Sequence, residues 1–144
     1  MEPSKVLKHG LKIPGFLGTF PLKNLQNLNV VKNKVSFIVV NNQHAVAVYI
    51  DELTIDILDP LGFQHSEAFS TICSFLSDHS PGKTLRIGPK IQSDTSSKCA
   101  KFALVFLYLR STGYSFMSTL QLYSHDQERN DDKVQSLFTT FFGL

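Results

Sequence analysis

The 144-residue chain contains no tryptophan and only two cysteines, Cys73 and Cys99. Two cysteines are too few for a disulfide scaffold, so we expect a protein that works in a reduced, intracellular environment. The sequence also lacks an apolar run long enough to cross a membrane, and residues 1–5 are not followed by the apolar core of a signal peptide. We therefore expect no membrane partner.

A strong excess of one charge is absent as well. Charged residues make up 18% of the chain and the formal net charge is +2, unlike the strongly basic composition of most nucleic-acid-binding proteins. The charges are nevertheless uneven, because residues 1–35 contain six lysines and one acidic residue, Glu2. Such a segment is more often a solvated surface than a DNA site, and both interpretations stay open.

Repeats and low-complexity linkers are also missing, and 42% of the side chains are apolar. This length and composition suit one domain with a substantial core. Residues 1–144 are therefore predicted to form a single domain, and we expect a monomer.

Hydrophobic periodicity predicts an α+β fold with a central, mostly antiparallel sheet packed against helices. Strands are expected at residues 35–40, 45–50, 53–58 and 84–87. The first two should form a hairpin, and the third should pair with the second as a meander. Helices are expected at residues 3–11, 66–76, 98–110 and 131–142, and an ordered loop at residues 14–21. Asp56 lies in mid-strand and is expected to be solvated.

Cys99 stands at the head of an apolar run, residues 100–109, that is typical of a helix buried on most of its surface. Ser96 and Ser97 are N-cap types, so a helix that begins near Lys98 would hold the Cys99 sulfur in its first turn. Free N–H groups and the positive end of the helix dipole stabilise a thiolate there. Cys99 is thus a candidate nucleophile, although a small buried cysteine that only fills space would show the same pattern.

A cysteine hydrolase also needs an imidazole, a group that orients it and donors for the oxyanion. His44 opens the second strand and Asp59 closes the third, so antiparallel pairing can bring them to the same sheet edge. Gln92 lies in the loop that leads to Cys99, and its amide and the Cys99 backbone N–H could donate to a tetrahedral oxyanion. His65 is close to Asp59 in sequence and is a second candidate base, but it is expected to open a helix. The remaining histidines have no cysteine or second histidine at ligand spacing, so no metal site is expected.

Four features follow one another in the order His, acid, Gln, Cys: His44, the phrase Leu58-Asp59-Pro60-Leu61-Gly62-Phe63, Gln92, and Cys99 after six intervening residues. In this order and spacing they resemble the adenain family of adenovirus-type maturation cysteine proteases, in the group that also contains SUMO-deconjugating enzymes. The likeness extends to residues 16–20 and 135–138 and so covers nearly the whole chain. The seven-residue step from Gln92 to Cys99 favours the adenain branch.

The resemblance implies a cysteine endopeptidase that cleaves viral precursor proteins during virion maturation, in the host nucleus or the virion. In such an enzyme Cys99 would be the nucleophile and His44 the general base and then the general acid. Asp59 would orient the imidazole, and Gln92 would donate to the oxyanion. The family prefers small residues, often glycine, around the cleaved bond. Its chemistry requires no cofactor.

The resemblance also implies activation by a disulfide-tethered peptide and by DNA. No cysteine lies between Cys73 and Cys99 to hold such a tether, whereas the lysine-rich residues 1–35 leave DNA binding open. Two positions depart from the family pattern: Ala45 stands where Trp usually follows the histidine, and Ala100 where Gly usually follows the cysteine. Two alternatives therefore stay open. One is a protease that removes ubiquitin-like proteins such as SUMO, and the other is an inactive relative that binds a partner or serves in a capsid.

Overall fold

The computed structural model describes residues 6–29, 33–42, 44–62, 67–94 and 96–143. The elements in this part of the chain are η1 (Lys8–Lys12), β1 (Phe16–Pro21), η2 (Leu22–Asn27), β2 (Val35–Asn41), β3 (His44–Ile50), β4 (Thr54–Leu58), α2 (Glu67–His79), β5 (Thr84–Ile87), α3 (Cys99–Ser111), α4 (Phe116–Leu120) and α5 (Gln127–Phe142). Both η elements are 3-10 helices. Within these residues no helix combines the length and apolar character that crossing a membrane requires.

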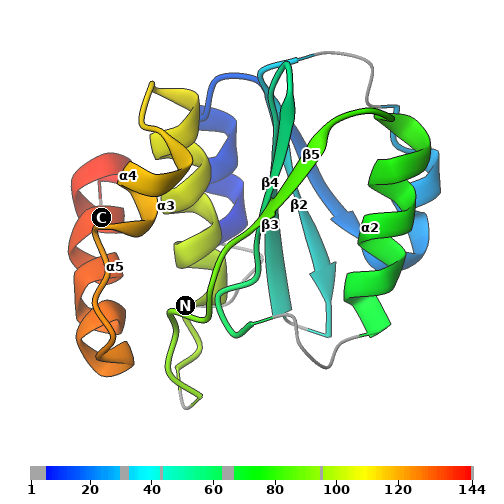
Figure 1. Ribbon diagram of the computed structural model, residues 1–144. Coiled ribbons are helices and arrows are strands. Elements are labelled where there is room, and N and C mark those ends of the chain that lie inside the picture. The colour runs from blue at the N-terminus through cyan, green and yellow to red at the C-terminus, as the bar shows by residue number, and fades with distance from the viewer. Residues whose placement is uncertain (1–5, 30–32, 43, 63–66, 95, 144) are drawn as a thin grey trace.

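The five strands form one sheet in the order β1-β2-β3-β4-β5. The three central strands, β2 to β4, are antiparallel to one another, and the β2–β3 hairpin pairs Asn41 with His44. Both outer strands, β1 and β5, run parallel to their neighbours. The predicted α+β class is confirmed, with a sheet that is antiparallel at its centre and parallel at its edges (Figure 1).

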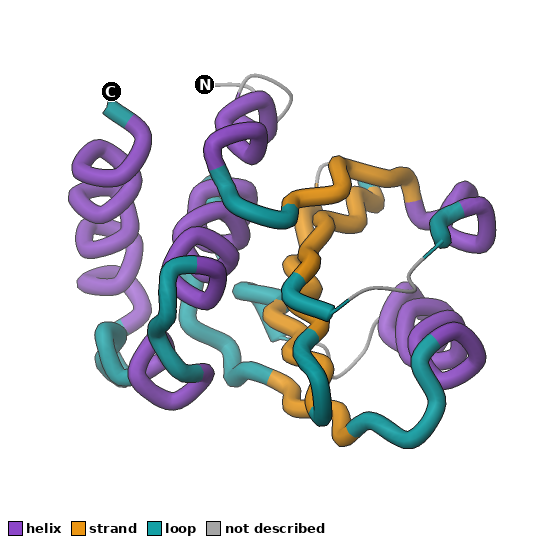
Figure 2. The backbone as a smooth tube through the Cα atoms, turned by 90° about the horizontal axis from the view of Figure 1, so that it is seen from above, coloured by secondary structure: helices purple, strands orange, loops and turns teal. Residues whose placement is uncertain are grey.

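Helices cover both faces of the sheet. Figure 2 shows α3, α4 and α5 on one side of the strands and α2 with η2 on the other. Successive side chains of a strand point to opposite faces, so β3 contributes to both cores. Ala45, Ala47 and Tyr49 pack with α3 and α5. Val46, Val48 and Ile50, which lie between them, belong to the core that includes α2.

Helix α3 is buried on nearly every side, because it lies between β3 and α5. All side chains from Phe102 to Leu107 are inaccessible to solvent. The apolar run therefore forms the buried helix that its composition indicates, and the helix begins at Cys99.

Several boundaries differ from those expected. Residues 16–21, expected as a loop, form the edge strand β1, because their backbone pairs with β2 although glycine and proline interrupt the sequence pattern. The short elements η2 and α4 were not predicted. Helix α5 begins at Gln127, four residues before the expected start, because the Asp126 carboxylate accepts hydrogen bonds from the N–H groups of Glu128 and Arg129.

The other two expected helices also shift. Of the helix expected over residues 3–11, the described part is helical at Val6 and Leu7 and continues as η1 at Lys8–Lys12, one residue beyond the expected end, and residues 1–5 lie outside the described part. Helix α2 extends to His79, three residues beyond its expected end, and the expected start at Ser66 is outside the described residues.

Asp56 is fully buried, so the expectation that it is solvated was wrong. Its carboxylate accepts hydrogen bonds from Arg86 Nε at 2.6 Å, Arg86 Nη2 at 3.0 Å and Arg110 Nε at 2.7 Å. Arg110 is itself 8% exposed. The pairing works because a buried carboxylate needs a charged, hydrogen-bonded partner, and these two come from β5 and α3.

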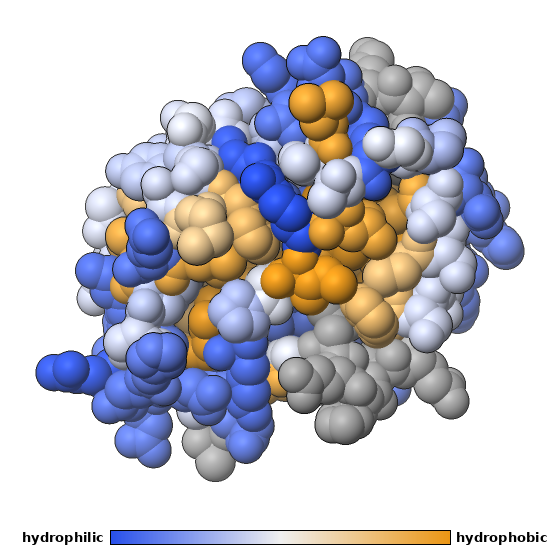
Figure 3. Space-filling view, in the orientation of Figure 1, coloured by the Kyte–Doolittle hydropathy of each residue, from blue (hydrophilic) through white to orange (hydrophobic). Residues whose placement is uncertain are grey.

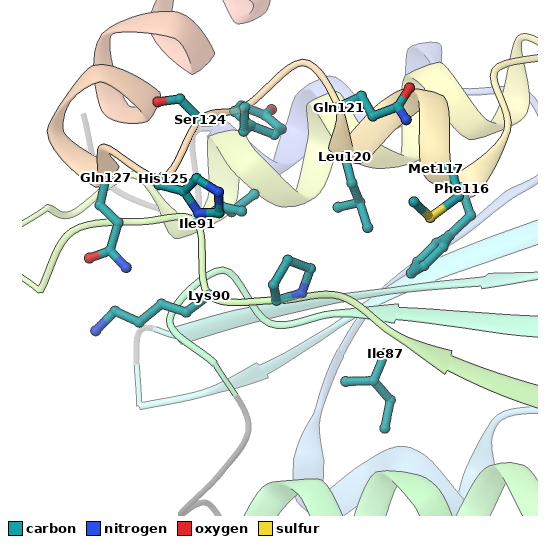
Figure 4. A pocket seen from close by; sticks show the side chains of 12 residues that line it. Ile87, Lys90, Ile91, Phe116, Met117, Leu120, Gln121, Ser124, His125 and Gln127 are labelled. Carbon is teal, nitrogen blue, oxygen red and sulfur yellow. The ribbon is translucent and has the colours of Figure 1, made fainter.

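A cavity of about 540 Å³ opens between β5 and α4 (Figure 4). Two of its lining side chains, Ile87 and Met117, are apolar and exposed at 44% and 58%. Figure 3 shows apolar side chains gathered at the centre of this face of the molecule, surrounded by polar ones.

We expect Asp56→Ala to lower the free energy of unfolding by about 3–5 kcal/mol, because it leaves the buried Arg110 without its main partner. Urea unfolding measures the change. Asp94→Ala is the matched control: Asp94 is paired with Lys90 but is 81% exposed, so its loss should change stability by less than about 1 kcal/mol. Equal changes in unfolding free energy for the two substitutions would show that the buried ion pair of Asp56 contributes no more to stability than the exposed pair of Asp94.

Candidate active site

The four predicted site residues come from four segments that meet at one edge of the sheet. His44 is the first residue of β3, and Asp59 directly follows β4. Because β3 and β4 are antiparallel neighbours, the beginning of one lies beside the end of the other. Gln92 lies between β5 and α3, and Cys99 is the first residue of α3.

His44 and Asp59 form a short hydrogen bond, with 2.5 Å between Nε2 and Oδ1. Asp59 is 2% exposed, and the same Oδ1 also accepts the backbone N–H of Leu61 at 3.0 Å. This second bond fixes the carboxylate. With Nε2 bound to Asp59, the buried Nδ1 is the ring nitrogen left for a thiol.

The charge state of His44 depends on both neighbours. Burial by itself lowers the pKa of His44, because the charged ring loses contact with water. The hydrogen bond with Asp59, a side-chain hydrogen bond with Cys99 and the charges of both groups outweigh burial and raise the pKa of His44 from 6.5 to about 9. The imidazolium is therefore the favoured form at neutral pH, as in a cysteine–histidine ion pair.

Cys99 is 5% exposed and lies in the first turn of α3. The residue before it, Lys98, occupies the cap position and makes no side-chain capping bond. Ser96, expected as a possible N-cap, instead accepts the Lys98 N–H on its Oγ at 3.1 Å. The sulfur thus lies where the helix dipole favours negative charge.

Gln92 is 1% exposed and is fixed by its side chain and its backbone. Its Nε2 donates to the carbonyl of Ser96 at 2.9 Å. Its backbone N–H donates to the carbonyl of Pro60 at 2.9 Å, and Pro60 also accepts the N–H of Ile91. An amide has two hydrogens, so the bond to Ser96 uses only one of the donors.

Sequence reasoning missed two backbone groups that shape this site, the Leu61 N–H and the Pro60 carbonyl. The Leu61 N–H holds the Asp59 carboxylate, and the Pro60 carbonyl holds the loop that carries Gln92. The sequence Asp59-Pro60 indicates a turn, but it does not indicate which distant groups the turn binds.

The two positions that depart from the adenain pattern are buried. Ala45 is 1% exposed and Ala100 is 3% exposed, and both pack in the core around α3.

His65, the second candidate base, lies outside the described residues. Among the residues that are described, no three or more His, Cys, Asp or Glu side chains are grouped to hold a metal ion.

The raised pKa of His44 predicts a pH-dependent stability. The charged ring contributes up to about 3 kcal/mol below pH 6.5, the unfolded value, and this contribution is lost as the pH rises through about 9. The difference in unfolding free energy between the wild type and His44→Gln should therefore shrink between pH 6.5 and 9. Urea unfolding across this range measures it, with His125→Gln, an exposed histidine, as the control. A difference that does not change with pH would contradict the prediction.

Comparisons with known proteins identify relatives by structure alone. No protein-family model and no curated protein matches the chain. The ASFV pS273R protease superposes with a TM-score of 0.57 at 10% identity, over 81% of this chain and 57% of that one. The SUMO protease Ulp1 superposes with a TM-score of 0.51 at 14% identity, over 94% of this chain and 74% of that one. The central domain of the uncharacterized Lpg1148 protein from Legionella pneumophila gives 0.51 at 12% identity, over 95% of this chain and 97% of that one.

The match spans little more than half of the pS273R chain, 57% of its length. At identities between 10% and 14%, such likeness is evidence for the fold. This chain has the fold of the ASFV pS273R protease and the SUMO protease Ulp1.

Proposed function

We propose that this protein is a cysteine endopeptidase with Cys99 as its nucleophile. The observation that carries the proposal is His44, which is hydrogen-bonded to the buried Asp59 and whose pKa is raised by Asp59 and Cys99 together. Nucleophile, base and orienting group in one connected chain are what cysteine-based acyl transfer needs. The shared fold with two proteases supports the same reaction class.

The reaction would begin from the Cys99 thiolate and the His44 imidazolium. The thiolate attacks the carbonyl carbon of the scissile peptide bond, and the oxyanion that forms accepts hydrogen bonds from Gln92 Nε2 and the Cys99 N–H. The imidazolium gives its proton to the leaving amine as the C–N bond breaks, leaving a thioester on Cys99. Neutral His44 then takes a proton from the water that attacks the thioester, and release of the acid restores the ion pair. Asp59 keeps the ring in place, and no step requires a cofactor.

For the substrate we propose viral precursor proteins cleaved beside small residues, in the host nucleus or the virion, by a monomeric enzyme. The motif order and the step from Gln92 to Cys99 support this proposal. The proposal includes an activating role for DNA, because Lys8, Lys12, Lys23 and Lys34 of the lysine-rich segment are exposed.

The second candidate function is removal of a ubiquitin-like protein from its conjugates, which is favoured by the match to the SUMO protease Ulp1 over 94% of this chain.

Cleavage of a fluorogenic peptide amide with glycine before the scissile bond tests the chemistry. We expect Cys99→Ala and His44→Ala to abolish turnover while keeping the circular dichroism spectrum, because each removes a reacting group. Cys73→Ser is the matched control, since this half-buried thiol belongs to α2 and the core on the opposite face. A Cys99 thiol that reacts with iodoacetamide at pH 7 no faster than free cysteine would overturn the proposal.

Gln92→Ala should lower kcat by about a hundredfold or more, because it removes a donor to the oxyanion. KM should change much less, since the oxyanion forms only in the transition state. Steady-state kinetics on the same peptide separate the two effects. An unchanged kcat would remove Gln92 from the proposed mechanism.

The two candidate substrates are separated by comparing this peptide with a SUMO fusion. We expect kcat/KM for the peptide to exceed that for the fusion if the enzyme processes viral precursors. Faster cleavage of the fusion would favour the deconjugating function. An absence of turnover with both, together with an unreactive Cys99, would favour the inactive relative.

A further inference from the structure

Two adjacent residues near the start of α5 bind the backbone on both sides of Gln92. Asn130 Nδ2 donates to the carbonyl of Ile91 at 3.0 Å. The Asp131 carboxylate accepts the Ser93 hydroxyl on Oδ2 at 2.5 Å and the Ser93 N–H on Oδ1 at 3.3 Å. The loop that carries Gln92 is therefore attached to α5 immediately before and immediately after this residue.

Asn130 also connects the two walls of the cavity beside this loop. Its Nδ2 donates to the carbonyl of Ser124 at 2.8 Å, and its Oδ1 accepts the Ser124 N–H at 2.7 Å. Ile91 and Ser124 both line the cavity and come from different segments (Figure 4). With Asn130 only 1% exposed, its amide is a fixed bridge.

The buried Asn130 amide lowers the stability of α5 relative to an apolar side chain at this position, so its presence needs an explanation other than packing. A buried amide is unfavourable unless it is hydrogen-bonded, and asparagine is a weak helix former. The next buried positions of α5, Val134 and Phe138, are apolar and pack with α3. Asn130 and Asp131 differ from them because both bind the loop that carries Gln92 through hydrogen bonds, and Asn130 also binds the backbone of Ser124.

The opposite side of the loop is held by the turn after Asp59. Pro60 accepts the N–H groups of both Ile91 and Gln92. The loop is thus fixed between the acid-bearing turn and α5. Asp131 also accepts the Lys98 ammonium on its backbone carbonyl at 3.4 Å, so α5 contacts the residue that precedes Cys99 as well.

We infer that Asn130 and Asp131 are positioning residues that hold Gln92 at the distance from Cys99 that oxyanion stabilisation requires. The inference rests on the proposed function. Neither residue touches the reacting atoms; both act through the loop. Displacement of a catalytic donor by about 1 Å can cost about a hundredfold in rate, so the loss of one loop bond is expected to be visible in kcat.

Asp131→Asn tests the inference with little change in shape. The asparagine amide has one acceptor atom where the carboxylate has two, so it cannot reproduce both Ser93 bonds as they stand, and we expect kcat for the fluorogenic peptide to fall about tenfold with little change in KM. The matched control is Asp132→Asn, which removes the same charge from the next, exposed residue of α5 and should leave kcat unchanged. Equal kcat values for Asp131→Asn and the wild type would overturn the inference.

A double-mutant cycle with Gln92→Ala separates positioning from a general structural role. If Asp131 acts through Gln92, Asp131→Asn should cause no further fall in kcat once the amide is gone. A structural role would lower kcat by the same factor in both backgrounds, and that result would overturn the inference.

Hydrogen exchange measured by mass spectrometry tests whether Asp131 holds the Gln92 loop without requiring enzyme turnover. Asp131→Asn should speed exchange in the peptide that contains residues 91–93 and leave α3 protected, whereas Asp132→Asn should change neither. Unchanged exchange would overturn the inference even if the enzyme is active. A wild type with an unreactive Cys99 and no turnover would instead refute the proposed function, and exchange would still report whether α5 holds the loop.

Discussion

The close packing of α3 on β3 is the constraint on which the candidate site depends. β3 presents the small side chains of Ala45 and Ala47 to the core that contains α3, so the helix can approach the sheet closely. Both elements begin at the same edge, one with His44 and the other with Cys99. A larger side chain at position 45 would push α3 away from β3, because the core between them is closely packed. The small Ala45 therefore allows the His44 imidazole and the Cys99 thiol to lie close together.

Near this contact, burial and hydrogen-bonded partners have opposite effects on the charge of a side chain. Burial alone would make His44 neutral, yet Asp59 and Cys99 raise its pKa to about 9. The same logic operates away from the site, where Asp56 is buried only because two arginines bind it. In both places a charge is retained inside the fold because hydrogen-bonded partners replace water.

The structures similar to this chain show how far sequences with this fold can diverge. The pS273R protease and Ulp1 keep this arrangement of sheet and helices at 10% and 14% identity to this chain. A fold that tolerates such divergence fixes the framework, whereas substrate choice depends on the residues around the site. In this chain the loop between β5 and α3, with its attachments to Pro60 and α5, is the part of the framework that bears most directly on the proposed chemistry.

The sequence by itself determined the hairpin whose second strand begins at His44, the buried helix that begins at Cys99 and the four candidate residues, because these follow from local periodicity and from the order of motifs. It did not indicate that β1 is a strand, since glycine and proline hide the pattern and only pairing with β2 reveals it. It misplaced Asp56 in solvent because the partners, Arg86 and Arg110, are distant in the chain. Asn130 and Asp131 carried no signal for the same reason: their hydrogen bonds to the Gln92 loop join segments nearly 40 residues apart, and only tertiary packing creates them.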